Sequence, residues 1–253
     1  MFLHRIRRLC QVLPFGLAAA CALGFGAYHR TPLSEPGSTN LPAALLTNAA
    51  LQRISEGVYG LGLVQLDKNT RTIRFPSVVN MSEGLVEYAL VHASGKVHES
   101  VLKTDADPLH IHLAKLLLAM NESASPPPAA GTPSEPAGAR IRIWVSWKSG
   151  AAEQRVPIEN LVSNTLTRAQ MTRGDWVYNG SRVVDGIFLA QRDGSIAAII
   201  ADPDALVNSP RPGRDDDDIW KANGSLVPPV GTPVDVSIEL GAGAPTASQS
   251  PPK

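Results

Sequence analysis

The chain has 253 residues, of which 43% are hydrophobic and 18% charged, so most of it has the composition of a folded protein. Lys plus Arg and Asp plus Glu both number 23, and this balance argues against binding to nucleic acid, which requires a basic surface. Cys10 and Cys21 are the two cysteines. Both lie near the N-terminus, which excludes disulfides, cysteine-ligated zinc and iron–sulfur clusters from the rest of the chain.

The N-terminus has the pattern of an export signal, because Arg5, Arg7 and Arg8 precede the apolar segment 9–27. Residues 1–29 are therefore expected to be a signal peptide or a membrane anchor. Three alternatives stay open: an uncleaved transmembrane helix, a cleaved signal, or a lipoprotein lipidated at Cys21. In each case the membrane is a partner of this segment, and the remainder faces the periplasm or the exterior.

Segments rich in Pro, Ser and Gly divide the remaining chain. Such segments cannot bury enough apolar surface to fold. We expect residues 30–42 to be a flexible spacer, 122–139 a disordered insertion and 241–253 a disordered tail. The part between the spacer and the tail, residues 43–240, is expected to be a single β-rich domain.

Short apolar runs separated by turn residues predict β-strands within this domain. The runs 58–66 and 72–79 flank a turn at 67–70 and predict a hairpin. The runs 85–93 and 96–104 flank Ser94-Gly95 and predict a second, tighter hairpin. Further strands are predicted at 141–147, 176–179, 187–191, 195–201 and 233–240.

One long helix is predicted at 108–120, with Asp107 as its N-cap and Pro108 at its first position. Its apolar residues occupy two sides, so we expect it to be covered on both. One side carries Ile111 and Leu118, and the other carries Leu109, Leu113, Leu116, Leu117 and Met120.

A second, weaker helix is predicted at 158–168. Because the predicted strands outnumber the helices, the fold class is α+β, with a mainly antiparallel, sandwich-like sheet and one buried helix.

Four stretches of sequence resemble a known family. The run GLVEYALVHASGKVHESVLKTDADPLHIHLAKLLLAM at 84–120 is similar to the YdjY-domain family, as are GSIAAIIADPDALVN at 194–208, DDDDIW at 215–220 and PPVGTPVDVSIEL at 228–240. The resemblance covers roughly residues 70–240. It implies an exported, envelope-associated bacterial domain without an assigned reaction. The ferredoxin-like description attached to the family name does not transfer, because no cysteine follows Cys21.

Candidate site residues cluster between the second hairpin and the helix. Histidine and carboxylate side chains are ligands for divalent metals, and this cluster consists of His98, Glu99, Asp105, Asp107 and His112. In the predicted hairpin Glu99 lies on an apolar face, where a carboxylate needs a partner. Lys103, a histidine or a backbone N–H at the start of the helix are the candidate donors.

The same residues also have a structural interpretation. Asp105 and Asp107 are typical of a helix start, where they complement the helix dipole. His110 and His112 lie about 200° apart around the helix axis and cannot both hold one ion.

A second acidic cluster precedes Trp220 and consists of Asp215, Asp216, Asp217 and Asp218. Four neighbouring carboxylates are a candidate calcium site, although their spacing lacks the alternation of an EF-hand loop. The alternative is a solvated acidic loop.

These observations predict an envelope-anchored, non-enzymatic binding or interaction domain of unknown ligand, with another envelope protein as a candidate partner. The alternative is a metal-dependent enzyme that uses the His/Glu/Asp cluster at 98–112. No cofactor is predicted, a divalent metal belongs to the alternative, and nucleic acid is not an expected partner.

Overall fold

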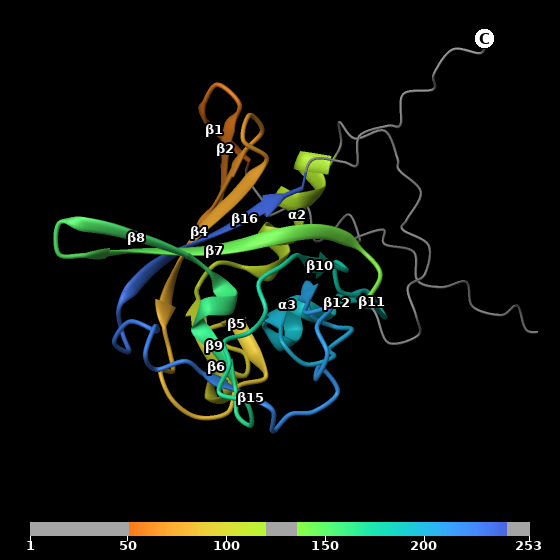
Figure 1. The fold of residues 1–253 in the computed structure, drawn as a ribbon. Helices are drawn as coiled ribbons and strands as arrows, with labels where there is room; N and C mark the ends of the chain where they lie inside the picture. Colours follow the sequence, from red (N-terminus) through yellow and green to blue (C-terminus); the bar gives the residue numbers. More distant parts are fainter. Residues whose placement is uncertain (1–50, 120–135, 242–253) are drawn as a thin grey trace, which may run out of the picture. The chain divides into compact units, whose positions relative to one another are not determined.

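The structure is a computed structural model that describes residues 51–119 and 136–241, all within one compact unit (Figure 1). The expectations for residues 1–29, the spacer and the tail after residue 241 lie outside the described residues, as does most of the insertion. Among the described helices, none combines the length and the apolar character needed to cross a bilayer.

Strands dominate the described residues, and two α-helices and two 3-10 turns connect them. The helical elements are η1 (Val97–Glu99), α2 (Pro108–Ala119), η2 (Ile158–Leu161) and α3 (Leu189–Asp193). The strands are β1 (Gln52–Ser55), β2 (Val58–Leu61), β3 (Val64–Asp67), β4 (Thr72–Val79), β5 (Tyr88–His92), β6 (Ser100–Thr104), β7 (Ala139–Ser149), β8 (Ala152–Pro157), β9 (Val162–Asn164), β10 (Trp176–Tyr178), β11 (Val183–Val184), β12 (Ile187–Phe188), β13 (Ser195–Ala198), β14 (Val207–Asn208), β15 (Trp220–Ala222) and β16 (Pro233–Leu240).

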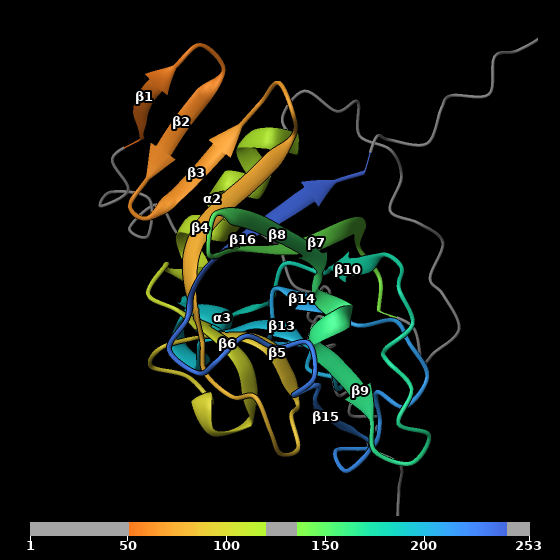
Figure 2. The same ribbon diagram turned by 60° about the vertical axis from the view of Figure 1, so that its left-hand side comes forward.

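Eight strands form a closed barrel in the order β4-β16-β7-β10-β14-β13-β5-β6, and all eight are labelled in Figure 2. Closure comes from β6, which returns to β4 by pairing Lys103 with Val78 and Leu102 with Val79. The pairs β5–β6 and β13–β14 are parallel, and the other pairs around the barrel are antiparallel. The mainly antiparallel character is thus confirmed, whereas the sandwich-like sheet is wrong, because β6 pairs back to β4 and closes these eight strands into a barrel.

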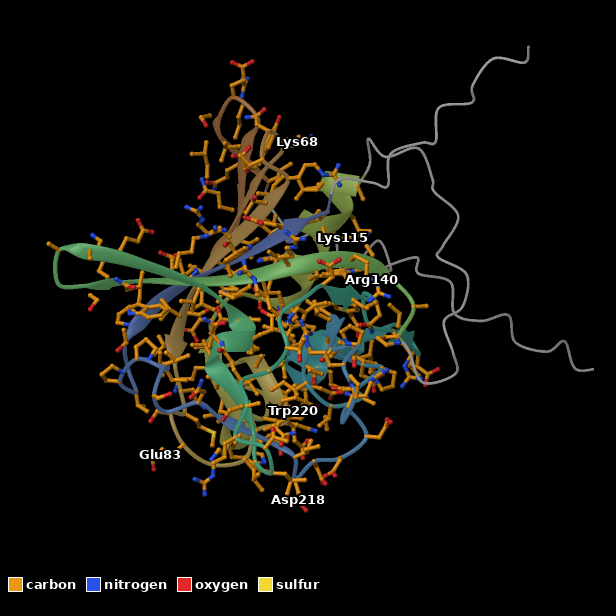
Figure 3. The ribbon with its side chains drawn as sticks, in the orientation of Figure 1. Lys68, Glu83, Lys115, Arg140, Asp218 and Trp220 are labelled. Carbon is orange, nitrogen blue, oxygen red and sulfur yellow. The ribbon has the colours of Figure 1, made fainter. Side chains whose placement is uncertain are left out.

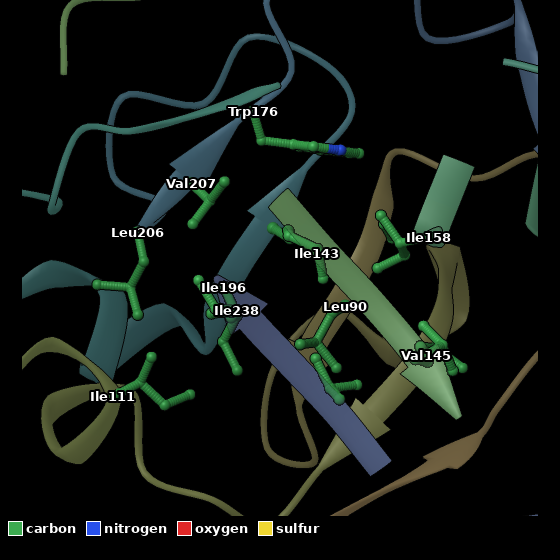
Figure 4. Packing of buried hydrophobic residues seen from close by; sticks show 14 of the residues in the cluster. Leu90, Ile111, Ile143, Val145, Ile158, Trp176, Ile196, Leu206, Val207 and Ile238 are labelled. Carbon is green, nitrogen blue, oxygen red and sulfur yellow. The ribbon is translucent and has the colours of Figure 1, made fainter. Parts of the chain in front are cut away.

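The barrel interior is filled by alternate residues of its strands. Along β7, Ile141, Ile143 and Val145 are buried while Arg142 and Trp144 face outward, as the period-two pattern predicted. Figure 4 shows Ile143 and Val145 in the same cluster as Leu90, Ile196 and Ile238 from other strands. Each such buried side chain stabilises the fold by roughly 1.5–3 kcal/mol.

The edge of β4 that faces β6 is shared with a second strand, β3. β6 pairs with the C-terminal end of β4, whereas β3 pairs with Thr72–Arg74 at its N-terminal end. From there β2 and β1 continue the sheet outward as a meander, and α2 packs against β3 and β4 (Figure 2). This arrangement confirms a hairpin around residues 67–70, between β3 and β4. The predicted strand 58–66 is divided, because the chain turns at Gly62 and Leu63 and β2 pairs with β3.

Helix α2 confirms the predicted helix as far as Ala119. All twelve of its residues are buried or half-buried, so it is covered on both sides. The most buried apolar stripe is Ile111, Ala114 and Leu118, and the leucines of the other side, Leu109, Leu113, Leu116 and Leu117, are half-buried.

The predicted hairpin at Ser94-Gly95 is wrong, because β5 and β6 run parallel, with Tyr88 beside Ser100. The chain does reverse at Gly95, and η1 then carries it back to the level where β5 began. Gly95 lies against the end of α3, where an added Cβ would be 2.8 Å from the Asp193 carbonyl oxygen. This close contact turns the chain over the barrel end instead of into a two-residue hairpin.

Three further boundaries differ from the expectations. Only Ile187–Phe188 of the strand 187–191 is extended, and α3 follows it and ends at Gly194 in the left-handed region (φ 70°). The predicted helix at 158–168 is limited to the 3-10 turn η2. Strand β7 begins at Ala139, the last residue of the expected insertion, because Ala139 pairs with Tyr178.

Candidate functional site

Trp144 lies on the outer face of the barrel, at the centre of β7. Its neighbours Ile143 and Val145 point into the core, so the alternation of the strand turns the indole outward, where it is half-buried. Its Nε1–H donates to Glu239 Oε2 of β16 over 2.9 Å. The indole is therefore held in one orientation on the barrel wall.

Two arginines contact the Trp144 ring. The guanidinium carbon of Arg155, on β8, is 4.2 Å from the ring centroid, and that of Arg173 is 4.9 Å from it. Arg155 also pairs with Glu239 at 2.7 Å. Within the described residues Arg173 has no carboxylate within ion-pair distance, so the indole face is its main partner.

A pocket of about 360 Å³ opens beside these side chains. Its volume falls in the range of small-molecule sites, roughly 300–1,000 Å³. Its lining is Arg142, Ile143, Trp144, Pro157, Glu159, Arg173 and Gly174.

Glu159, one of the lining residues, forms a buried ion pair with Arg211. Arg211 Nη2 is 2.5 Å from Glu159 Oε1, and the two side chains are only 9% and 3% exposed. Burial lowers the pKa of the Arg211 guanidinium, and the Glu159 carboxylate opposes that shift. A pair this poorly solvated is stabilised only when its remaining hydrogen-bonding groups are also satisfied.

Those remaining hydrogen bonds go to the loop that carries Arg173. Arg211 donates from Nε to the Thr172 carbonyl oxygen at 2.5 Å and from Nη2 to the Gly174 carbonyl oxygen at 2.8 Å. The Gly174 N–H donates to Glu159 Oε1 at 3.0 Å. Both neighbours of Arg173 are thus fixed, and the loop presents its guanidinium to the pocket in a defined position.

The charges around the pocket are nearly balanced. Asp175 pairs with Arg142 at 3.2 Å, Glu239 with Arg155 and Glu159 with Arg211. Each of these three arginines has a carboxylate partner, whereas Arg173 has none among the described residues. The pocket therefore combines one free cation with an aromatic wall, which suits an organic anion.

The family model of the YdjY domain matches residues 64–239, more than two thirds of the chain. The chain belongs to the YdjY-domain family. The matched range of the YdjY domain runs from β3 into β16 and includes the barrel and the pocket beside Trp144. No curated protein and no solved structure matches the chain.

The YdjY domain brings His98 and Glu99 together at η1. His98 Nε2 is 3.6 Å from Glu99 Oε2, and Lys96 Nζ is 3.5 Å from Glu99 Oε1. The Glu99 side chain is 19% exposed, and its ion-pair partners are Lys96 and a histidine, His98, whereas the candidate Lys103 is not among them. Burial raises the pKa of the adjacent Glu87 carboxyl, and the Glu99 carboxylate raises it further.

The other members of the predicted cluster have different partners. Asp105 is exposed at the turn before α2. Asp107 accepts from Gln191 Nε2 at 3.1 Å and lies 3.5 Å from His110 Nδ1. None of these contacts includes His112. Within the described residues, the five candidate ligands are therefore not joined in one group of mutually contacting side chains.

His112 is buried in an aromatic environment on α2. Its ring stacks on Tyr178, with Nδ1 3.2 Å from the Tyr178 hydroxyl, and it also contacts Phe188. Burial lowers the pKa of His112 to about 4, and the ammonium of Lys115, labelled in Figure 3, adds to the shift. Burial also raises the pKa of Tyr178. A neutral imidazole between aromatic rings is consistent with a packing role.

The acidic cluster before Trp220 is on the surface (Figure 3). Asp216, Asp217 and Asp218 each offer a carboxylate oxygen, all within 4.8 Å of one another, and Asp215 lies outside this group. The Asp218 N–H donates to Asp216 Oδ1 at 3.0 Å, as in an ordinary acidic turn. Cys21, the candidate lipidation site, lies outside the described residues.

None of the residues that line the pocket was predicted from the sequence to be a site residue. Trp144 did carry a signal, because it sits on the polar side of the alternating strand between Arg142 and Ser146. Glu159 and Arg211 carried none, since they are separated by 52 positions and meet only in the folded barrel.

Proposed function

We propose that this YdjY domain is a non-enzymatic binding domain whose pocket beside Trp144 takes a small organic anion through Arg173. The observation that carries the proposal is the Arg173 guanidinium, which faces an indole ring and has no carboxylate partner among the described residues. Its flanking residues are fixed by Arg211 and Glu159. A site that is ordered before binding loses little conformational entropy when a ligand enters.

The ligand chemistry follows from these groups. A guanidinium offers parallel N–H donors that match a carboxylate or phosphate group. The Trp144 ring and Pro157 provide an apolar wall for a planar or aromatic body. We therefore infer an anion with an unsaturated or aromatic portion as the ligand class.

The contacts favour binding over catalysis. Glu159 is the carboxylate that lines this pocket among the described residues, and Arg211 and the Gly174 N–H already engage its Oε1. A general base needs to reach a substrate proton. The metal-dependent alternative at residues 98–112 has less support, because Asp107 and His112 contact different groups from His98 and Glu99.

Calorimetric titration of the full chain with benzoate, and with benzamide as the neutral isostere, tests the proposal. Benzoate should bind and benzamide should bind at least tenfold more weakly, because the charge-assisted hydrogen bonds are worth roughly 1.5–3 kcal/mol. Arg173→Gln should remove this difference. Arg53→Gln, an exposed arginine on β1, is the matched control and should keep it. Equal binding of both probes would refute the proposal.

We also propose that the domain works outside the cytoplasmic membrane. The support is the Arg-rich start followed by the apolar segment 9–27. A periplasm-active reporter fused after Lys253 should be active, and a cytoplasm-only reporter should be inactive. The reverse pattern would contradict export.

A further inference from the structure

A second pocket lies at a small ribbon outside the barrel, formed by β9 and β15. Lys221 of β15 pairs with Ser163 of β9, and bridges extend this row to Leu85 on one side and Gln170 on the other. Directly paired residues project from the same face of a ribbon. Lys221 and Ser163 therefore share one face, and both line a pocket of about 320 Å³.

The walls of this pocket are tightly fixed. The Ala222 N–H donates to the Gly84 carbonyl oxygen at 3.0 Å, and Asn223 Nδ2 donates to the Asn160 carbonyl oxygen at 2.9 Å. Gly224 lies so close to the opposite wall that an added Cβ would be 2.9 Å from the Ser82 carbonyl oxygen. The two loops that border the pocket are thus held against each other by backbone contacts.

Arg168 reaches the pocket from an unusual backbone conformation. Its φ is 59°, in the left-handed region, within a turn that Asn164 organises by accepting from the Leu166 and Thr167 N–H groups at 2.9 Å. Glycine or asparagine fits this position at lower energetic cost than arginine. A strained residue whose side chain lines a pocket points to a role for that side chain.

The pocket groups are mainly hydrogen-bond donors. Arg168 and Lys221 have no carboxylate within ion-pair distance among the described residues, and the hydroxyls of Ser82, Ser163 and Ser225 lie in the same lining. Ser163 is buried, with 5% of its surface exposed. Glu83, labelled in Figure 3, is the one acidic group in the lining. Two positive side chains, Arg168 and Lys221, against the one carboxylate of Glu83 leave the lining with one excess positive charge.

We propose that this pocket is a second binding site and that it takes an oxyanion, a phosphate or a carboxylate group, between Arg168 and Lys221. Two cations and nearby hydroxyls provide the charge-assisted donors that such a group requires. Glu83 provides an acceptor for a hydroxyl on the remainder of the ligand. The site is separate from the pocket beside Trp144, since the two linings share no residue.

Titration of the full chain with inorganic phosphate, followed by NMR of the Ala222 and Gly224 amides, tests this site. Saturable shifts are expected in the wild type. Arg168→Gly should weaken phosphate binding at least tenfold while the melting temperature stays equal or rises, because glycine relieves the left-handed backbone. Lys221→Gln should also weaken binding. A purely structural role for Arg168 does not predict this combination.

Two further arms complete the test. Arg173→Gln removes the cation of the other pocket and should leave phosphate binding at wild-type strength, which separates this inference from the proposed function. Acetate in place of phosphate shows which oxyanion the site prefers, and Arg168-dependent binding of either supports it. Absence of saturable shifts with both anions, or wild-type affinity in Arg168→Gly, would overturn the inference.

Discussion

The guanidinium of Arg211 donates from Nη2 to Glu159 Oε1 over 2.5 Å beneath the loop that presents Arg173. The same guanidinium also donates to the backbone on both sides of Arg173. This buried pair links η2 to the segment after β14. It also fixes the backbone on both sides of Arg173. The position of Arg173 depends on charges that water cannot screen.

Glu159→Gln should destabilise the domain by about 3 kcal/mol or more, because it leaves the Arg211 charge buried without a counter-ion. The free energy of unfolding in denaturant measures the effect. Asp175→Asn is the matched control, since it breaks the exposed pair with Arg142, and it should cost less than about 1 kcal/mol. Similar costs for both variants would show that burial of the Arg211–Glu159 pair contributes nothing particular.

Stability should fall on acidification through His112. Its pKa is lowered to about 4 in the folded protein, mainly by burial, while an unfolded chain takes up the proton near pH 6.5. The unfolded state therefore binds the proton first, so this contribution is complete above about pH 6.5 and is lost as the pH falls toward 4.

The shift corresponds to about 3 kcal/mol at the acid end. His112→Gln should lower stability at pH 7 but flatten the curve between pH 6.5 and 4, as measured by thermal unfolding across that range. His98→Gln removes a histidine whose side chain is 77% exposed and serves as the control. A curve for His112→Gln parallel to that of the wild type would contradict the assignment.

Gly95→Ala should destabilise the turn between β5 and β6 by about 1–3 kcal/mol, because its Cβ would be 2.8 Å from the Asp193 carbonyl oxygen. Gly60→Ala is a suitable comparison, since its Cβ would meet the movable end of the Ile54 side chain at 3.2 Å. That variant should lose less than about 1 kcal/mol. Denaturant unfolding of the two proteins compares them directly, and an equal loss would contradict the close packing at Gly95.

Tyr88→Phe should cost about 1–2 kcal/mol. The Tyr88 hydroxyl donates to Asp202 Oδ2 at 2.9 Å and accepts from Lys96 Nζ at 3.0 Å, and burial raises the pKa of the phenol to about 12. Phenylalanine keeps the ring but removes both bonds. Tyr59→Phe, at a hydroxyl without a hydrogen bond to the described residues, should be nearly neutral in the same thermal-unfolding measurement. A neutral Tyr88→Phe would show that these two hydrogen bonds contribute no net stability.

The features that the sequence predicted are those set by neighbouring residues. The alternation at 141–147 acts locally, so β7 followed from it, and α2 begins at Pro108 as predicted. The cap of α2 was not predicted, because the Leu109 N–H donates to Gln191 Oε1, far away in the chain, while the Asp107 carboxylate accepts from Gln191 Nε2. The connection between the parallel strands β5 and β6 instead packs Gly95 against Gly194, which lies far from it in the chain. Closure of the barrel and the Glu159–Arg211 pair also join residues that are far apart in the chain. The periodicity of a single sequence contains no information on such contacts.

Strand β16 lies between β4 and β7 and pairs with both of them along most of its length. The last described strand in chain order thus has a neighbour on both sides in the barrel. One of these neighbours, β4, lies more than 150 residues earlier in the chain. Until Pro233–Leu240 have been synthesised, β4 and β7 each keep an open edge that can pair with another chain. The barrel therefore cannot be completed before β16 is present, and a chain that ends before Pro233 is expected to aggregate.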